Sequence, residues 1–348
     1  MAKMKRVEPS RDFHNRTVVV TGASAGVGCA VALRFARAGA RIGLIARDAQ
    51  ALEGVRNEVE RLGGSAIAAA ADVADPGAVF AAAEQIRGAF GPIDVWVNDA
   101  MVTVFAPAWQ ISPEEFRRVT EVTYLGAVHG TLAALRDMRP RGRGTIIQIG
   151  SALAYRGIPL QAAYCGAKHA IRGFTDSLRS ELIHTRSRIK ISMVQLPAVN
   201  TPQFDWARTH MARQPRPVPP VIEPEVIAEA VFRTAQRPRR EVWIGWSTIE
   251  VILGNLLLPA FLDRYVARHA FESQETADPV RPERQDNLFE PVHGLHRTRG
   301  RFSREAGRAA PAIAGPTVRV APIAAGALAL AAVAFFARGP ARARPHRN

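Results

Sequence analysis

The sequence predicts a doubly wound α/β fold, in which helices cover both faces of a mostly parallel sheet. Short apolar runs alternate with segments of helical length between residues 17 and 245 of the 348-residue chain. Strands are expected at 17–21, 41–46, 65–71, 93–98, 145–149, 189–196 and 241–245, and helices at 27–38, 49–62, 76–90, 113–136, 162–185 and 224–235. Strands this short and apolar are typical of parallel sheets that are buried on both faces. The helix over 113–136 is the best marked, because an N-cap serine, a proline and two acids open it at Ser112.

The chain divides into a catalytic α/β domain and a C-terminal extension. A polar arm over 1–16 precedes the domain at 17–248, and an apolar helical extension follows at 249–271. The pattern of that extension favours a buried or dimer-interface helix, with a membrane-facing or substrate-entrance element as the alternative. The polar, Pro- and Arg-rich stretch 272–318 is interpreted as a weakly ordered linker.

The last segment, 319–348, combines an apolar run with a basic tail. Residues 320–337 are mostly alanine and reach only the lower end of membrane-spanning length. We expect a candidate transmembrane helix there, against the alternative of a packed or disordered Ala-rich tail. With two cysteines and no signal-peptide core at the start, the catalytic domain is expected in the cytoplasm.

The formal net charge of +15 is concentrated near the C-terminus. Ten arginines and one glutamate between residues 297 and 347 account for nine of these charges. A localised basic tail favours an anionic surface or simple solubility. No zinc-finger spacing and no RNA-recognition motif accompanies it, so no nucleic-acid partner is expected.

A glycine-rich turn follows the first expected strand and opens the first helix. It comprises Thr21, Gly22, Ala23, Ser24, Ala25, Gly26, Val27 and Gly28. Glycines let a backbone turn tightly and approach a pyrophosphate, and a helix N-terminus offers that anion unpaired N–H groups. A purely structural turn is the alternative for the glycines alone. The strand–turn–helix context favours binding of a dinucleotide.

The end of the second expected strand indicates whether the bound dinucleotide carries a 2′-phosphate. An acidic residue there would bind the ribose hydroxyls and repel a 2′-phosphate. This chain has Ala46 and then Arg47, whose guanidinium can pair with that phosphate. The neighbouring Asp48 weakens the signal, and an exposed arginine at a strand end is often only solvated. We expect NADP(H) rather than NAD(H).

Three side chains form the candidate catalytic group. Ser151 follows the fifth expected strand, and Tyr164 and Lys168 lie one turn apart on the next helix, which places them on one face. A nearby ammonium lowers the pKa of a tyrosine towards the working range, and a serine hydroxyl can bind a substrate oxygen. Alone, the pair would more often be an ordinary helix surface pair. Combined with the glycine turn, it predicts hydride transfer with acid–base assistance from Tyr164.

These segments resemble the short-chain dehydrogenase/reductase family over roughly residues 16–245, about two-thirds of the chain. The matching positions are the turn at 21–28, Asp72-Val73, Asn98-Asp99-Ala100, Ser151, Tyr164 with Lys168, Pro197 and Thr201-Pro202. The resemblance implies a Rossmann-type sheet. It further implies that Asp72 and Val73 meet the adenine and that Asn98 lies beside the cofactor. Thr201 would then touch the carboxamide or the pyrophosphate, Pro197 would also contact the cofactor, and Lys168 would hydrogen-bond the nicotinamide ribose.

The chain departs from the family pattern at two places. Met101 stands where the family has a glycine after Asn-Asn-Ala. The family's further relay asparagine corresponds to Thr123. If the relay uses the backbone carbonyl at that position, Thr123 keeps this acceptor. If the relay uses the side chain, proton supply to the catalytic group is slower. Thr123 is therefore a doubtful member of the catalytic group.

Other residues carry weaker signals. Cys165 has no histidine partner that would make it a nucleophile, so helix packing is expected. His293 and His296 show no metal-ligand spacing and are interpreted as solvated, and no metal site is expected. The irregular stretch 197–220 is interpreted as a mobile flap. Three apolar residues in it would either line a substrate pocket or pack the flap down: Phe204, Trp206 and Met211.

The first functional hypothesis is an NADP(H)-dependent oxidoreductase for an apolar carbonyl or secondary alcohol. We expect it to be a homo-oligomer, with membrane association through the C-terminus. The alternative is a non-catalytic dinucleotide-binding sensor or membrane-associated scaffold, which Met101 and Thr123 keep open. The fold alone does not name the substrate.

Overall fold

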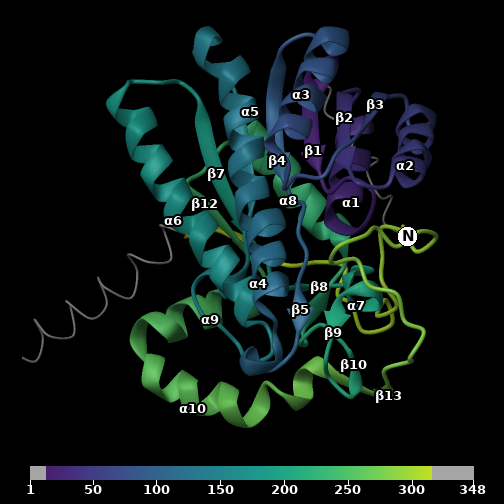
Figure 1. The fold of residues 1–348 in the computed structure, drawn as a ribbon. Coiled ribbons are helices and arrows are strands. Elements are labelled where there is room, and N and C mark those ends of the chain that lie inside the picture. Colours follow the sequence, from purple (N-terminus) through teal and green to yellow (C-terminus); the bar gives the residue numbers. More distant parts are fainter. Residues whose placement is uncertain (1–12, 316–348) are drawn as a thin grey trace, which may run out of the picture.

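The computed structural model describes residues 13–315 and confirms the predicted parallel sheet. In this part of the chain, the strands run in the order β14-β12-β7-β6-β4-β1-β2-β3, with β14 alone antiparallel at the edge (Figure 1). Their bounds are β1 (Thr17–Thr21), β2 (Arg41–Ala46), β3 (Ser65–Ala70), β4 (Ile93–Asn98), β6 (Thr145–Ile149), β7 (Lys190–Gln195), β12 (Glu241–Ile244) and β14 (Ala312–Ala314). The winding reverses between β1 and β4, which is where a doubly wound sheet binds its ligand.

Helices cover both faces of this sheet, as the sequence predicts. On one face lie α1 (Gly26–Ala36), α2 (Ala49–Arg61) and α8 (Pro224–Gln236), and on the other α3 (Pro76–Phe90), α5 (Gly126–Arg141) and α6 (Ala162–His184). The helix expected over 113–136 has three parts: α4 (Pro113–Val119), a π-helical turn (Thr120–Leu125) and α5. The capping box between Ser112 and Glu115 that opens α4 is present. The π-helical turn therefore interrupts an otherwise regular helix, which often marks a functional site.

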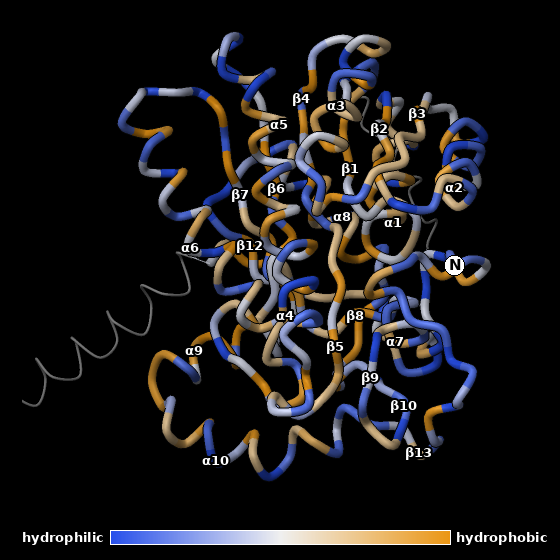
Figure 2. The backbone as a smooth tube through the Cα atoms, viewed as in Figure 1, coloured by the Kyte–Doolittle hydropathy of each residue, from blue (hydrophilic) through white to orange (hydrophobic). Residues whose placement is uncertain are grey.

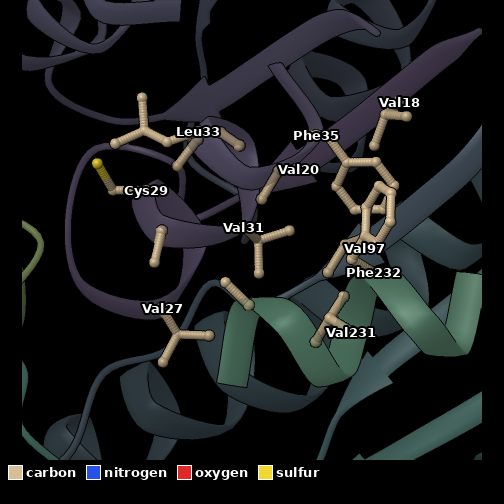
Figure 3. Close-up of a cluster of buried hydrophobic side chains, with 14 of the residues drawn as sticks. Val18, Val20, Val27, Cys29, Val31, Leu33, Phe35, Val97, Val231 and Phe232 are labelled. Atoms are coloured by element: carbon tan, nitrogen blue, oxygen red, sulfur yellow. The ribbon is translucent and has the colours of Figure 1, made fainter. Parts of the chain in front are cut away.

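The core between α1 and α8 holds the first strand and its glycine turn in position. Figure 3 shows Val31 and Phe35 of α1 directed towards Val231 and Phe232 of α8. The rings of Phe35 and Phe232 are 5.1 Å apart between centroids, and both side chains are almost fully buried. Burying a side chain of this size contributes about 1.5–3 kcal/mol. The N-terminus of α1 is thereby fixed at the carboxyl end of β1.

The stretch 197–220 is built of short, paired elements rather than irregular chain. It contains β8 (Ala198–Val199), α7 (Gln203–Trp206), β9 (Arg208–Thr209) and β10 (Arg213–Pro215), followed by β11 (Val221–Ile222). β8 pairs with β11, β9 with β5 (Val104–Phe105), and β10 with β13 (Glu275–Pro279). The flap is therefore hydrogen-bonded on several sides, and its expected mobility stays a prediction.

The apolar extension forms two helices that meet at Pro259. α9 (Trp246–Leu257) buries Ile249 and Ile252, whereas α10 (Pro259–His269) has no fully buried side chain. Figure 2 shows apolar residues along both helices, below the main body of the molecule. The exposed large side chains there are Trp246, Leu256, Leu257, Leu258, Phe261 and Tyr265. This extension is thus only partly buried, and the dimer-interface interpretation stays a prediction.

The structure corrects the expected linker over 272–318 for the part that it describes. Residues 272–315 pack against the domain through a 3₁₀ turn (Glu272–Gln274), β13 and β14. We call residues 284–303 the C-terminal strap. Its Leu288 is completely buried, and its backbone bonds to distant loops, for example Asn287 N–H to the Trp206 carbonyl at 2.9 Å. Local composition could not reveal these contacts because they join residues about 80 positions apart.

Residues 320–337, the candidate transmembrane helix, lie outside the described residues. Between residues 13 and 315, no helix combines the length and the apolar character needed to cross a membrane.

Candidate active site

The glycine turn has the close backbone packing that its sequence predicts. Gly22 has a φ of +72°, and a Cβ atom on it would lie 2.9 Å from the backbone of Ala100. A Cβ atom on Gly28 would lie 2.3 Å from the carbonyl oxygen of Gly22. A larger residue at either position would force the turn apart. Only glycine therefore fits at both places.

The first turn of α1 suits an anion. Ala25, its N-cap residue, has no side chain that can accept a backbone hydrogen bond. N–H groups at such a helix start need an external acceptor, and the positive end of the helix dipole favours a negatively charged one. One of them, Gly26 N–H, donates to the carbonyl of Arg297 in the C-terminal strap at 3.0 Å. The turn thus fits the pyrophosphate of a dinucleotide, with the strap beside it.

The residues after β4 are held against the turn. The hydroxyl oxygen of Thr21 accepts the N–H groups of Asp99 at 3.1 Å and Ala100 at 3.2 Å. The side chain of Asn98 points away from the glycine turn. Its amide donates to Thr131 and Gln148, both at 3.0 Å.

This arrangement corrects one expectation. The oxygen of the Asn98 side chain accepts from the indole of Trp96 at 2.8 Å, so all of its polar atoms have partners inside the protein. Asn98 orders the sheet interior beneath the site, and it does not line the cavity described below.

Ser151, Tyr164 and Lys168 come together, as the sequence predicts. Ser151 caps a short 3₁₀ turn after β6, and its backbone N–H donates to the Gln195 side chain at 2.8 Å. The Tyr164 hydroxyl is hydrogen-bonded to Ser151. The ammonium of Lys168 lies 5.6 Å from the centre of the Tyr164 ring and donates to the Ile149 carbonyl at 2.7 Å. The three groups therefore line one side of a common space.

Burial dominates the electrostatics of this group. Desolvation raises the pKa of Tyr164 above its ordinary value, although the hydrogen bond from Ser151 lowers it. Desolvation lowers the pKa of Lys168 to about 8, and the negative charge of Asp99 opposes that shift. Desolvation likewise raises the pKa of Asp99 to about 7, while Lys168 and the Gly28 N–H group oppose it. At neutral pH Tyr164 is therefore a phenol and can give up a proton.

Thr123 lies in the π-helical turn and does not face the site through its side chain. Its hydroxyl donates to the Val102 carbonyl at 2.9 Å and accepts the Val102 N–H at 3.1 Å. The side chain is thus occupied in holding the loop after β4. A relay through the Thr123 side chain is not supported, and a relay through its backbone carbonyl stays a prediction. Met101, the other departure, lines the cavity.

The side of the site where the resemblance places the adenine is strongly charged. Asp72 accepts a hydrogen bond from the N–H of Ala74 at 2.9 Å and pairs with Arg118 at 2.5 Å. Arg47 donates to two strap carbonyls, those of Phe289 at 2.7 Å and Asn287 at 2.5 Å. The Arg47 guanidinium is therefore oriented by the strap and is not merely solvated.

The two strap histidines are not simply solvated, which corrects the sequence interpretation. Both lie against Asp48, with His293 Nδ1 at 2.6 Å and His296 Nε2 at 3.2 Å from the same carboxylate oxygen. His293 is largely exposed, whereas the side chain of His296 is only 15% exposed. Among the residues that the structure describes, no cluster of histidine, cysteine and acidic side chains could hold a metal ion.

One cavity of about 670 Å³ joins these parts. Most of the predicted site residues line it: Gly22, Ser24, Ala25, Gly26, Val27, Arg47, Asp72, Val73, Ser151, Tyr164, Lys168, Pro197 and Thr201. Thr21, Gly28, Asn98 and Thr123 lie behind this lining and support it. The predicted residues therefore separate into a contacting group and a supporting group.

The far end of the cavity is mainly apolar. Phe204 of the flap lines it and also packs against the cluster of Met211 and Phe105, whereas Trp206 lines the cavity beside His296 of the strap. The flap thus both lines the cavity and packs against the domain, and Phe204 does both. α9 and α10 also contribute, through residues such as Val251 and Val266. α9 and α10 therefore border the cavity, and the substrate-entrance alternative for the extension stays a prediction.

Sequence reasoning missed two components of the site. Asp99 replaces an asparagine in the family pattern, a signal that was present beside the more conspicuous Met101. The strap contributes Asn287, Pro291, Val292 and His296 to the cavity lining, and no local motif indicates this. Cys165, by contrast, is a packing residue as expected. It is buried, and burial raises the pKa of its thiol to about 11.

Comparison with known proteins identifies the family. The family model described as short chain dehydrogenase matches residues 16–212, more than half of the chain. The protein belongs to the short-chain dehydrogenase family. An uncharacterized oxidoreductase of Bacillus subtilis, YxnA, is 31% identical over 288 residues, which cover 82% of this chain and 81% of that protein.

Other relatives match a smaller part of this short-chain dehydrogenase. Dehydrogenase/reductase SDR family member 7B of Mus musculus is 34% identical over 205 residues, 57% of this chain and 62% of the mouse protein. A metagenomic short-chain oxidoreductase solved in complex with NADP is 29% identical, with a TM-score of 0.56. An alcohol dehydrogenase of Thermococcus sibiricus complexed with 5-hydroxy-NADP is 27% identical, with a TM-score of 0.57. Each of the two matches covers 66% of this chain. They cover 96% of the metagenomic oxidoreductase and 95% of the Thermococcus alcohol dehydrogenase.

Proposed function

We propose that this protein transfers a hydride between NADP(H) and the carbonyl or secondary alcohol group of an apolar compound. The observation that carries the proposal is the assembly of Ser151, Tyr164 and Lys168 in the wall of the cavity that also contains the glycine turn. A dinucleotide-binding turn and an acid–base group are thereby brought to one space. This is the arrangement that hydride transfer requires.

Each of the three residues has a distinct task. When bound, NADPH supplies the hydride from C4 of its nicotinamide. Tyr164, a phenol at neutral pH because of burial, gives its proton to the substrate oxygen. Ser151, already hydrogen-bonded to Tyr164, holds the same oxygen where negative charge develops. Lys168 places a buried positive charge beside Tyr164 and stabilises the tyrosinate that remains.

Arg47 supports NADP(H) over NAD(H). It lines the cavity at the end of β2, where an adenosine ribose would lie by analogy with other doubly wound sheets. Its two hydrogen bonds to strap carbonyls leave three of its five N–H groups for a phosphate. The two similar structures, which were solved with NADP and with 5-hydroxy-NADP, agree with this proposal.

The apolar substrate class follows from the far end of the cavity, where Phe204 and Val251 are among the lining residues. Binding sites of this kind gain affinity from apolar area and orientation from a few polar groups. Self-association, membrane association through the C-terminus and the lack of a nucleic-acid partner stay predictions. Sedimentation of the full chain with and without vesicles or DNA would test all three.

A screen for NADPH oxidation over aldehydes, ketones and quinones of increasing chain length tests the function. We expect turnover that improves with apolar chain length and falls by roughly 10²–10⁴-fold in Tyr164→Phe, with NADPH affinity nearly unchanged. Tyr124→Phe, on the neighbouring π-helical turn, is the matched control and should keep its activity. NADPH binding without turnover on any carbonyl, or full activity in Tyr164→Phe, would favour the non-catalytic alternative.

A further inference from the structure

The C-terminal strap crosses the carboxyl edge of the sheet and is attached on both sides of the cofactor cleft. On the β2 side, Arg118 donates to the Leu288 carbonyl at 3.0 Å, and Leu288 is completely buried. On the β7 side, Gly300 N–H donates to the Asn200 carbonyl at 3.1 Å. Figure 1 shows this yellow part of the chain passing α7 and the start of α1. The strap therefore bridges the cleft rather than lying along one side of it.

An aspartate on the β7 side holds the strap by charge. Asp205 accepts a hydrogen bond from Arg297 at 2.5 Å and lies 3.5 Å from Arg301. Asp205 is not among the residues that line the cavity. It is thus an attachment point that can be changed without touching the groups that would hold a dinucleotide.

The strap covers the cleft and leaves a cavity beneath it, although its Arg297 carbonyl accepts the Gly26 N–H of the glycine turn at 3.0 Å. Four strap residues line the same cavity as Gly26, Arg47 and Tyr164, namely Asn287, Pro291, Val292 and His296. The space beneath the strap is continuous from the glycine turn to the catalytic group. A ligand in that space would have protein on its outer side as well.

The inner side of the strap offers a polar group without a hydrogen-bond partner. The ring of His296 packs at a tilt of 49° against Trp206, with 5.2 Å between ring centres, and both of its ring nitrogens are buried and form no hydrogen bond. Its Nε2 atom lies 3.2 Å from the Asp48 carboxylate, in a geometry that forms no hydrogen bond. A buried imidazole in this position needs a polar partner, and phosphate and ribose oxygens are suitable ones.

We propose that the C-terminal strap is the outer wall of the dinucleotide site, and that bound cofactor leaves only when the strap detaches. Arg47 and His296 bind the phosphate and ribose of the adenosine half beneath it. The carbonyls of Asn287 and Phe289 hold Arg47 in place for that contact. This inference rests on the proposed function, and it assigns a role to residues that lie outside the family match at 16–212.

The release rate of NADPH from the full chain tests the proposal. Bound NADPH is displaced with excess NADP⁺ in a stopped-flow instrument, and its dissociation constant is measured separately by fluorescence titration. Asp205→Asn removes the charge that holds Arg297 and Arg301. Gly300→Ala places a methyl group 2.5 Å from the Thr201 carbonyl oxygen and lifts the strap sterically. Asp278→Asn and Gly88→Ala are the matched controls, because Asp278 is exposed and a Cβ atom on Gly88 meets nothing within 4 Å.

We expect NADPH release at least tenfold faster in both strap variants than in the wild type and the controls, with equal or weaker affinity. An outer wall slows entry and exit alike, so its loss cannot tighten binding. If the variants bind NADPH more tightly at an unchanged release rate, the strap competes with the cofactor and the proposal is overturned. An unchanged release rate in Asp205→Asn also overturns it, even if Gly300→Ala fails to fold. Failure of the wild type to bind any nicotinamide dinucleotide would instead refute the proposed function, and this inference with it.

Discussion

The hydroxyl of Thr123 binds both polar backbone groups of Val102, donating to the carbonyl at 2.9 Å and accepting from the N–H at 3.1 Å. Both residues are almost completely buried. A single side chain in the π-helical turn therefore satisfies the backbone of the loop that follows β4. That loop carries Met101 into the cavity wall, so Thr123 positions the site without lining it.

Replacement of Thr123 by valine should lower stability more than its small change in shape suggests. The variant leaves the N–H and carbonyl of Val102 buried without partners, which costs about 1–3 kcal/mol for each unsatisfied group. Chemical denaturation of the full chain measures the loss. Thr120→Val is the matched control, since the Thr120 hydroxyl is in an exposed hydrogen bond to the Phe116 carbonyl. Equal stability of the two variants would contradict the structural role of Thr123.

Replacement of Asp99 by asparagine should move the pH profile of carbonyl reduction. As the pH rises through about 7, Asp99 ionises in the wild type, and its charge raises the pKa values of Lys168 and Tyr164. Without that charge, the pKa of Lys168 falls further below its ordinary value. Lys168 then loses its proton at lower pH, so the alkaline limb of kcat/KM shifts to lower pH. Asp278→Asn, at an exposed position, should leave the profile in place. A profile that is the same in all three proteins would exclude coupling between Asp99 and the catalytic group.

Replacement of Arg47 by alanine should reduce cofactor selectivity. Loss of the hydrogen bonds from a guanidinium to a phosphate costs about 1.5–3 kcal/mol, or roughly 10–100-fold in the dissociation constant for NADPH. NADH lacks the 2′-phosphate. The dissociation constant for NADH therefore measures how far the loss of the strap contact at Phe289 weakens dinucleotide binding in general. The ratio of the two dissociation constants therefore isolates the phosphate contact. Arg61→Ala, an exposed position on α2, should leave that ratio unchanged. Parallel losses for both cofactors in Arg47→Ala would show that this residue only holds the strap.

Replacement of Gly28 by alanine should disrupt the glycine turn. The new Cβ atom would lie 2.3 Å from the Gly22 carbonyl oxygen, which belongs to rigid backbone. Overpacking of this kind costs about 1–3 kcal/mol, and the displaced turn should weaken dinucleotide binding at least tenfold. Thermal unfolding and NADPH titration measure both effects. Gly88→Ala on α3 meets no neighbour and should be neutral or slightly stabilising. Wild-type affinity in Gly28→Ala would mean that the turn can move without cost.

Several properties were predictable from the sequence because they depend on local periodicity and short spacing. The parallel sheet, its covering helices and the glycine turn all follow from patterns within about ten residues. Tyr164 and Lys168 share a helix face because they are four residues apart. Ser151 joins them because carboxyl ends of parallel strands meet at one edge. For these residues the sequence alone determined the arrangement.

Tertiary structure decided everything that depends on contacts between distant residues. Asn98 turned inward because Trp96, Thr131 and Gln148 surround it, although the next residue, Asp99, lines the cavity. Desolvation set the pKa shifts of Tyr164 and Lys168, and no sequence pattern contains burial.

The C-terminal strap is the clearest case of this division. Its composition is that of a disordered linker, because its few apolar residues cannot form a core of their own. It is ordered because it packs on a domain that is already formed, where Leu288 enters the core and Arg47 and Asp205 bind its backbone and its arginines. The sequence by itself therefore determined the fold and the catalytic group, and only the tertiary structure decided what encloses them.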